Sequence, residues 1–166
     1  PTLDKIEWAT GAYVLDDRHM SLVRDFASLH CLCRNSCKLV FSPDSGELIE
    51  LTKNSALAWS RAFEWPWAIL NSDLGPADSC LDAGGSHGVF QYLAAHLTSS
   101  VVNVDKSPHV KQAMTDMAGR MNVSSKMKFV QADLASLPFP DGRFSKVFCI
   151  STLEHDPNWR QCLREL

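Results

Sequence analysis

The sequence has 166 residues, of which 45% are hydrophobic and 21% are charged. This composition suits one folded domain with a small appendage, and it excludes a wholly disordered chain. The formal net charge of −3 provides no general basic field for a nucleic-acid backbone, so a nucleic-acid partner is disfavoured.

The amino-terminal sequence and its cysteines bear on the cellular compartment. No run of 18 apolar residues is present, and residues 1–5 lack the layout of a signal peptide. We therefore expect no membrane span and a cytoplasmic location, where cysteines remain thiols. Cys31, Cys33 and Cys37 cluster after His30, but they lack the paired CxxC rhythm of a zinc site. No metal site is predicted, and whether these three cysteines bind a metal stays open.

Residues 1–75 form the first of two predicted regions, which is mainly helical with one hairpin. Apolar residues recur at helical spacing over residues 17–33. Residues 38–41 and 47–51 are β-rich runs on either side of a Pro-Asp-Ser-Gly turn, which predicts the hairpin. A second helix is expected from about residue 54 to residue 71, with Pro66 inside it.

Residues 76–166 alternate short apolar strands with helices. Strands are predicted at 79–82, 101–105, 127–131 and 145–151, and helices at 89–97, at 108–121 and from 156 onward. Ser107 is expected to cap the second of these helices, and Asp156 the third. This order predicts an α/β fold with a Rossmann-like parallel sheet and flanking helices. Because Leu166 falls within an amphipathic helix, we expect a sheet that is incomplete at the C-terminus, whose exposed edge favours self-association.

A glycine-rich turn follows the first of these strands, in the order Asp82-Ala83-Gly84-Gly85-Ser86-His87-Gly88. Glycine lets the backbone pass close to a ligand, and the following helix offers free N–H groups. Asp105 ends the next strand, where a carboxylate can accept hydrogen bonds from both ribose hydroxyls. The arrangement predicts a nucleoside-binding site.

Two later stretches complete a wider pattern. Residues 133–147 read D-L-A-S-L-P-F-P-D-G-R-F-S-K-V, and Leu153-Glu154-His155 follows the fourth strand. With these four motifs in order, residues 79–166 resemble the class I S-adenosylmethionine-dependent methyltransferases, especially the small-molecule and quinone methylases. The resemblance implies S-adenosylmethionine as cofactor and methyl transfer to a small-molecule acceptor.

The resemblance also implies roles for individual residues. Gly84, Ser86 and Gly88 would line the turn beneath the methionine part of the cofactor, together with Asp82 and Gly85. Asp105 would bind the ribose hydroxyls, and Lys106 would frame the adenine. Asp133 would accept from the adenine amino group, and the Leu134 N–H would face the ring. Ser151, with Thr152, would face the sulfonium. The chain departs from the family pattern in two places, because serines stand at 86 and 145 where that pattern has a glycine and an acid.

Other interpretations stay open. Each of three aspartates has a structural alternative to cofactor binding. Asp82 would cap the turn, Asp105 would lie at a solvated strand end, and Asp133 would stabilise a local turn before the Leu-Pro loop. His155 is a weak candidate for a general base. An alternative to an active methyltransferase is a degenerate cofactor-binding or scaffolding module without transfer activity. A nicotinamide-dependent oxidoreductase is a third alternative, which the Leu-Pro-Phe-Pro-Asp and Leu-Glu-His stretches disfavour. The acceptor and its methylated atom are not predicted.

Overall fold

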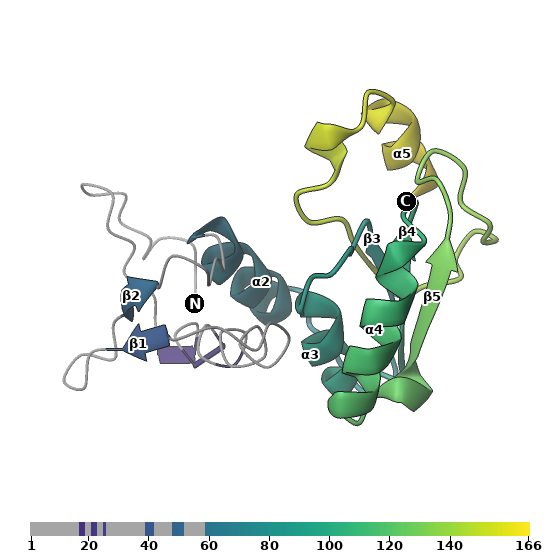
Figure 1. The fold of residues 1–166 in the computed structure, drawn as a ribbon. Helices are drawn as coiled ribbons and strands as arrows, with labels where there is room; N and C mark the ends of the chain where they lie inside the picture. The colour runs from purple at the N-terminus through teal and green to yellow at the C-terminus, as the bar shows by residue number, and fades with distance from the viewer. Residues whose placement is uncertain (1–16, 19–20, 23–24, 26–38, 42–47, 52–58) are drawn as a thin grey trace. The chain divides into compact units, whose positions relative to one another are not determined.

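The structure is a computed structural model that describes residues 17–18, 21–22, 25, 39–41, 48–51 and 59–166 (Figure 1). The chain divides into two compact units, residues 1–70 and residues 71–166. Each unit is taken by itself below. The region around Cys31, Cys33 and Cys37 lies outside the described residues.

The first unit contains the predicted hairpin. Strand β1 (Leu39–Phe41) pairs antiparallel with β2 (Leu48–Leu51), and the register shifts between Val40 and Phe41. The described residues at 17, 18, 21, 22 and 25 are helical, inside the first predicted helix. Helix α2 (Trp59–Asn71) ends at the predicted residue and continues through Pro66; residues 54–58 of its predicted start are outside the described part.

The second unit is built on a parallel sheet of four strands. They are β3 (Ser79–Ala83), β4 (Ser100–Asp105), β5 (Met127–Gln131) and β6 (Lys146–Phe148), in the order β5-β4-β3-β6. The predicted α/β, Rossmann-like sheet is therefore confirmed. The fourth strand was predicted at 145–151 but is shorter, because its ladder with β3 pairs only residues 146–148 with residues 80–82. The chain has already left the strand before the left-handed residue Ser151 (φ 50°).

Helices α3 (Phe90–Leu97) and α4 (His109–Arg120) connect β3 to β4 and β4 to β5. Both crossovers step across the sheet in the same direction, so the right-handed rule places both helices on one face. The predicted cap at Ser107 is wrong: Pro108 is the N-cap of α4 and no side chain bonds there. The Ser107 N–H instead donates to Asp105 Oδ1 at 2.8 Å, which makes a turn at the end of β4.

Two short 3₁₀ turns complete the second unit. The turn η2 (Ser124–Lys126) precedes β5, and η3 (Leu153–His155) precedes helix α5 (Trp159–Glu165). Its N-cap is Asn158 rather than the predicted Asp156, whose Oδ1 accepts from the Asn158 N–H at 2.8 Å. No helix among the described residues has the length and apolar character needed to cross a membrane.

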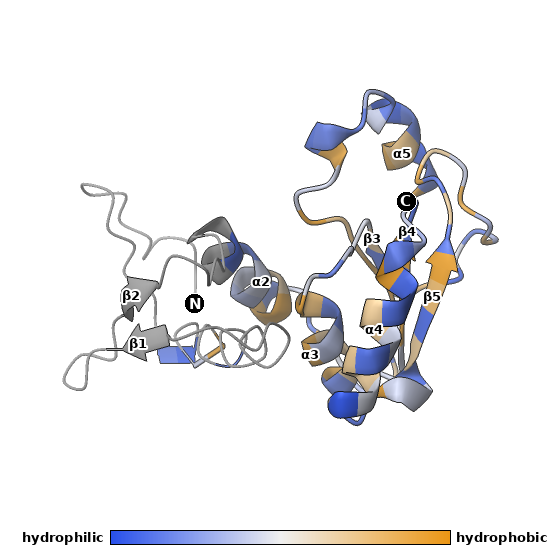
Figure 2. Cartoon of the chain, viewed as in Figure 1, coloured by the Kyte–Doolittle hydropathy of each residue, from blue (hydrophilic) through white to orange (hydrophobic). Residues whose placement is uncertain are grey.

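The two faces of the sheet are covered differently. On one face, Leu81, Ala83, Val102 and Val104 pack with Leu134 and Cys162 in a buried cluster. On the other face, helices such as α4 turn apolar residues inward and polar ones outward, a mixture visible in Figure 2. Burial of these apolar side chains is the main stabilising term for this unit, and it fixes the carboxyl ends of the strands in one layer.

Candidate functional site

A pocket of about 230 Å³ opens at the carboxyl ends of the four parallel strands. The chain steps from β3 to β4 to β5 and then returns to β6 on the other side of β3. In α/β sheets, ligands bind at the carboxyl ends where the strand order reverses in this way. The residues that line the pocket follow all four strands: Gly84, Ser86, Asp105, Lys106, Ala132, Asp133, Leu134, Ser151, Thr152, His155 and Asp156.

The glycine turn forms one wall of the pocket. The Gly84 N–H donates to the Val104 carbonyl at 2.7 Å, and Gly84 has a φ of 72°. A Cβ at Gly84 would overlap the side chain of Thr152 on the facing wall. Only glycine combines this φ with this close approach. Ser86 also lies in the left-handed region (φ 46°), where a non-glycine residue needs support from its surroundings.

Asp82 lies beneath the turn and does not line the pocket. It is only 4% exposed, and a Cβ at Gly85 would collide with its carboxylate. Burial raises the pKa of Asp82 to about 7, and the negative charge of Asp105 adds to the rise. Gly85 and Gly88 are likewise absent from the lining. Of the predicted turn residues, the structure brings Gly84 and Ser86 to the pocket.

Carboxylates stand at the carboxyl ends of β4 and β5. Asp105, at the end of β4, is half-buried, and its Oδ1 accepts from the Ser107 N–H. Asp133 follows β5 and accepts from the Ala135 N–H through Oδ1 at 2.8 Å. In each side chain the second oxygen keeps lone pairs for a donor from a ligand. Leu134 is 7% exposed and joins the core cluster, so it fixes the position of this wall.

The wall after β6 carries Ser151, Thr152 and His155. Ser151 has a φ of 50°, and the Thr152 hydroxyl donates to the Gly84 carbonyl at 3.3 Å. The His155 side chain is 78% exposed. Backbone outliers of this kind concentrate at ligand sites, and this pocket has two of them, at Ser86 and Ser151, in facing walls.

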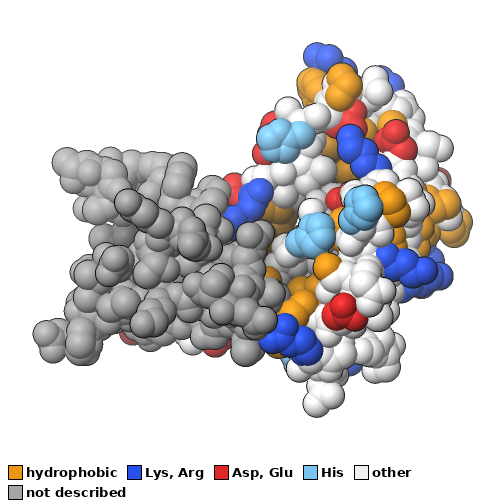
Figure 3. Space-filling model, in the orientation of Figure 1, with side chains coloured by type: hydrophobic (Ala, Val, Ile, Leu, Met, Phe, Trp, Pro, Cys, Tyr) orange, Lys and Arg blue, Asp and Glu red, His pale blue; other side chains and the backbone are white. Residues whose placement is uncertain are grey.

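Sequence reasoning missed two lining residues, Ala132 and Asp156. Ala132 has no polar side chain to attract attention, and Asp156 was interpreted as a helix cap. Together with Asp105 and Asp133, Asp156 makes the pocket acidic, and Lys106 and His155 are the basic residues of its lining. Such a pocket suits ligands that present hydroxyl, amino or cationic groups. In the view of Figure 3, acidic and basic side chains are interspersed over the described surface.

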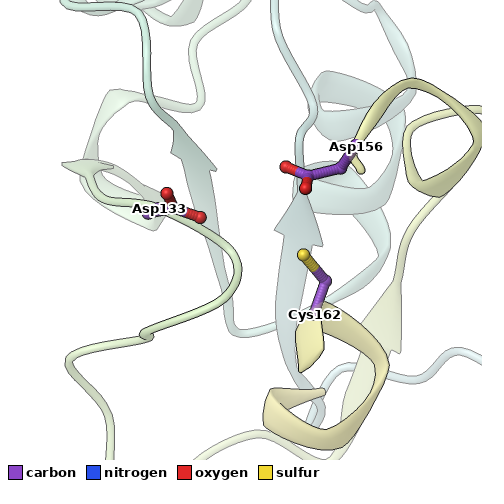
Figure 4. Close-up of side chains that lie close together, drawn as sticks. All are labelled: Asp133, Asp156 and Cys162. Atoms are coloured by element: carbon purple, nitrogen blue, oxygen red, sulfur yellow. The ribbon is translucent and has the colours of Figure 1, made fainter. Parts of the chain in front are cut away.

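Asp133, Asp156 and Cys162 bring possible metal-ligand atoms within 4.8 Å of one another. In Figure 4 the Cys162 thiol of α5 points toward the Asp156 carboxylate. Burial raises the pKa of the Cys162 thiol, and the charges of Asp156 and Asp133 raise it further. A thiol that keeps its proton is a poor metal ligand, and each aspartate already accepts a backbone hydrogen bond. We propose no metal site on this group.

Ser145 lies at the opposite end of β6 from the pocket. Its hydroxyl donates to Asp78 Oδ1 at 2.7 Å, and its N–H donates to the Ser79 carbonyl at 2.9 Å. The Ser145 bond is the largest cause that lowers the pKa of Asp78, followed by a hydrogen bond from the Gly75 N–H. The serine at this position thus joins β6 to β3 and is remote from any ligand in the pocket.

The part of the chain that forms the pocket is similar to known proteins. Residues 81–166 match the profile of a family described as a methyltransferase domain. Relatives include a probable chloroplastic tocopherol O-methyltransferase from Oryza sativa subsp. japonica, 33% identical over 89 residues. Another is the sterol 4-C-methyltransferase strm-1 from Caenorhabditis elegans, 26% identical over 87 residues. These matches cover 53% and 52% of this chain. The chain spans 25% and 26% of the length of these two relatives.

Solved structures share the fold. The YcgJ protein from Bacillus subtilis superposes with a TM-score of 0.57 at 24% identity, over 61% of this chain and 43% of that protein. The [4+2]-cyclase SpnF gives a TM-score of 0.59 at 16% identity, over 93% of this chain and 57% of SpnF. At these identities the likeness concerns the fold alone.

Proposed function

The chain belongs to the methyltransferase-domain family, and on this premise we propose that it is part of an S-adenosylmethionine-dependent methyltransferase of class I. We propose further that the pocket holds S-adenosylmethionine and that the acceptor is a small molecule. The curated relatives named above, which methylate tocopherol and a sterol by their names, support the choice of a small-molecule acceptor.

One observation carries the proposal: the glycine turn after β3 and the carboxylate of Asp105 after β4 line the same cavity. A nucleoside needs an open backbone on one side and a hydroxyl acceptor on the other. Gly84 supplies the first, since no side chain larger than hydrogen fits there. Asp105 supplies the second through the oxygen that does not bond to Ser107.

The other lining residues fit the remaining parts of the cofactor. Asp133 would accept from the adenine amino group, and the Leu134 N–H would face the ring. Lys106 would border the adenine, while Ser86 and Ser151 would lie toward the methionine and sulfonium end. The acidic lining suits a cofactor that carries an ammonium and a sulfonium group. Asp82, Gly85 and Gly88 would act indirectly, by shaping the turn.

The cofactor supplies an activated methyl group, and the protein supplies orientation and a restricted environment. In this pocket Thr152 holds the Gly84 carbonyl from the facing wall, so it fixes the distance between the two walls. His155 lines the same pocket and is exposed, so we propose it as the residue that accepts a proton from an acidic acceptor.

We also propose a cytoplasmic location. Cys80, Cys149 and Cys162 are free thiols in the described part of the chain, which is the usual state of cysteine in a reducing compartment.

Calorimetric titration of the chain with S-adenosylhomocysteine and, separately, with NADH tests the proposed function. We expect binding of S-adenosylhomocysteine and none of NADH. Binding of NADH alone would show that the sheet serves a nicotinamide enzyme. If the chain binds S-adenosylhomocysteine, a longer protein that contains this chain and matches the length of the relatives is then assayed. The assay measures transfer of labelled methyl from S-adenosylmethionine to tocopherol-like and sterol-like acceptors.

A further inference from the structure

Two buried amides lie behind the glycine turn, on the face of the sheet that α3 covers. Asn103 is in the middle of β4 and Gln91 is in the first turn of α3, and both are 0% exposed. The Asn103 Nδ2 donates to Gln91 Oε1 at 2.7 Å. A buried amide is costly unless it is hydrogen-bonded, so the groups that satisfy these two side chains indicate what they do.

Most of their hydrogen bonds go to the backbone of the turn. The Ser86 carbonyl accepts from Asn103 Nδ2 at 3.1 Å and from Gln91 Nε2 at 3.2 Å. Gln91 Nε2 also donates to the Gly88 carbonyl at 2.8 Å. One strand and one helix therefore hold the same short stretch of backbone from below. Apart from the bond between the two amides, their N–H groups donate to carbonyls of the turn that lines the pocket.

The conformation at Ser86 explains why such support is needed. Its φ of 46° lies in the left-handed region, which serine enters at a cost and glycine enters freely. Among the described residues, the hydrogen bond of the Ser86 hydroxyl is with the neighbouring His87 ring, at 3.3 Å to Nδ1, so the hydroxyl does not hold the backbone in place. The backbone is held instead by the side-chain amides of Asn103 and Gln91, which donate to the Ser86 carbonyl.

The remaining polar atom of the pair shows that the network is not arranged for stability alone. Asn103 Oδ1 is buried and has no hydrogen-bond partner among the described residues. Asp82 is its neighbour in the register of β3 and β4, and a Cβ at Gly85 would contact both Asp82 and the Asn103 amide. An apolar side chain at 103 would avoid the unpaired oxygen, but it would leave the Ser86 carbonyl with one donor fewer.

We propose that Asn103 and Gln91 are positioning residues that hold the turn at Ser86 in its ligand-binding conformation. The inference rests on the proposed function, because the ligand in question is the adenosyl cofactor in this pocket. Asn103 and Gln91 bond to the turn, and neither lines the pocket. They act by keeping the Ser86 backbone in a conformation that the serine alone would seldom adopt.

The test uses Asn103→Leu, which keeps the volume and removes the donor, and measures the affinity for S-adenosylhomocysteine by calorimetry. We expect affinity to fall by about tenfold, the effect of losing one or two hydrogen bonds that organise a site. The double variant Asn103→Leu/Ser86→Gly should recover most of that loss, because glycine adopts the left-handed conformation without support. A purely structural role would not be rescued by a change in the turn.

The matched control is Thr98→Val. It removes the buried hydroxyl of the C-cap residue of α3, which donates to the Ala94 carbonyl within that helix, and it should leave the affinity unchanged. Hydrogen exchange of the amides at 84–88 provides a second measurement in the ligand-free protein, and Asn103→Leu should accelerate it selectively.

The outcomes separate this inference from the function on which it rests. If the parent chain binds S-adenosylhomocysteine and Asn103→Leu binds it equally well, the positioning role is wrong. A loss of affinity that Ser86→Gly does not rescue also contradicts it. If the parent chain fails to bind the ligand at all, the proposed function itself is wrong.

Discussion

Asp82 provides the clearest test of the electrostatics beneath the turn. Burial, with a contribution from Asp105, raises the pKa of this carboxyl from 3.8 to about 7, and no hydrogen bond from a described residue offsets the rise. The folded protein therefore holds a proton on Asp82 at pH values where the unfolded chain has released it. A raised folded-state pKa contributes stability that is complete below pH 3.8 and is lost as the pH rises through 7.

The size of the effect follows from the shift. A rise of about three pKa units corresponds to roughly 4 kcal/mol in total, of which about 2–3 kcal/mol falls between pH 5 and pH 8. Asp82→Asn removes the titrating group and keeps its shape. The free energy of unfolding of the parent chain should thus fall by about 2–3 kcal/mol more than that of Asp82→Asn over this interval.

Urea unfolding of both proteins at pH 5, 6, 7 and 8 measures this difference. Asp116→Asn is the control, because it removes a carboxylate from the exposed side of α4, and its pH dependence should follow that of the parent chain. If Asp82→Asn and the parent chain lose the same stability between pH 5 and pH 8, Asp82 is ionised in the folded state, and the reasoning from its burial is wrong.

Three further substitutions probe the two ends of the sheet. Asp105→Ala should weaken S-adenosylhomocysteine binding by roughly 1–3 kcal/mol in calorimetry, because it removes a charged acceptor; an unchanged affinity would remove Asp105 from the site. Gly84→Ala should abolish that binding, whereas Gly142→Ala, which has a similar φ of 68° but open space around it, should leave the affinity unchanged. Ser145→Ala should move the pKa of Asp78 upward in an NMR titration without any effect on affinity, and a pKa that stays in place would contradict the assigned hydrogen bond.

The sequence was sufficient to predict the sheet and the region of the pocket. Strand β5 begins and ends at the predicted residues, and β3 and β4 differ from the prediction by one residue each. Their apolar runs are bounded by turn residues, so local pattern and tertiary position agree. Asp105 follows from the same argument, because the carboxyl ends of parallel strands meet at one edge.

The rest depends on contacts between residues distant in the chain. Asn103 and Gln91 bond to the turn only because the register of β4 and the placement of α3 bring them beneath it, and no local pattern reveals that. The early end of β6 at Phe148 depends on its pairing with β3, which is distant in the chain, and no local pattern marks that residue. Asp82 has the expected residue type in the expected turn, yet burial places it below the pocket and not in its lining.

A crystal structure of the chain with S-adenosylhomocysteine tests the central claim most directly. The account predicts the ribose hydroxyls on Asp105, the adenine beside Asp133 and the amino-acid end over Gly84 and Ser86. A ligand bound elsewhere, or a glycine turn that closes over the pocket and excludes it, would contradict the account.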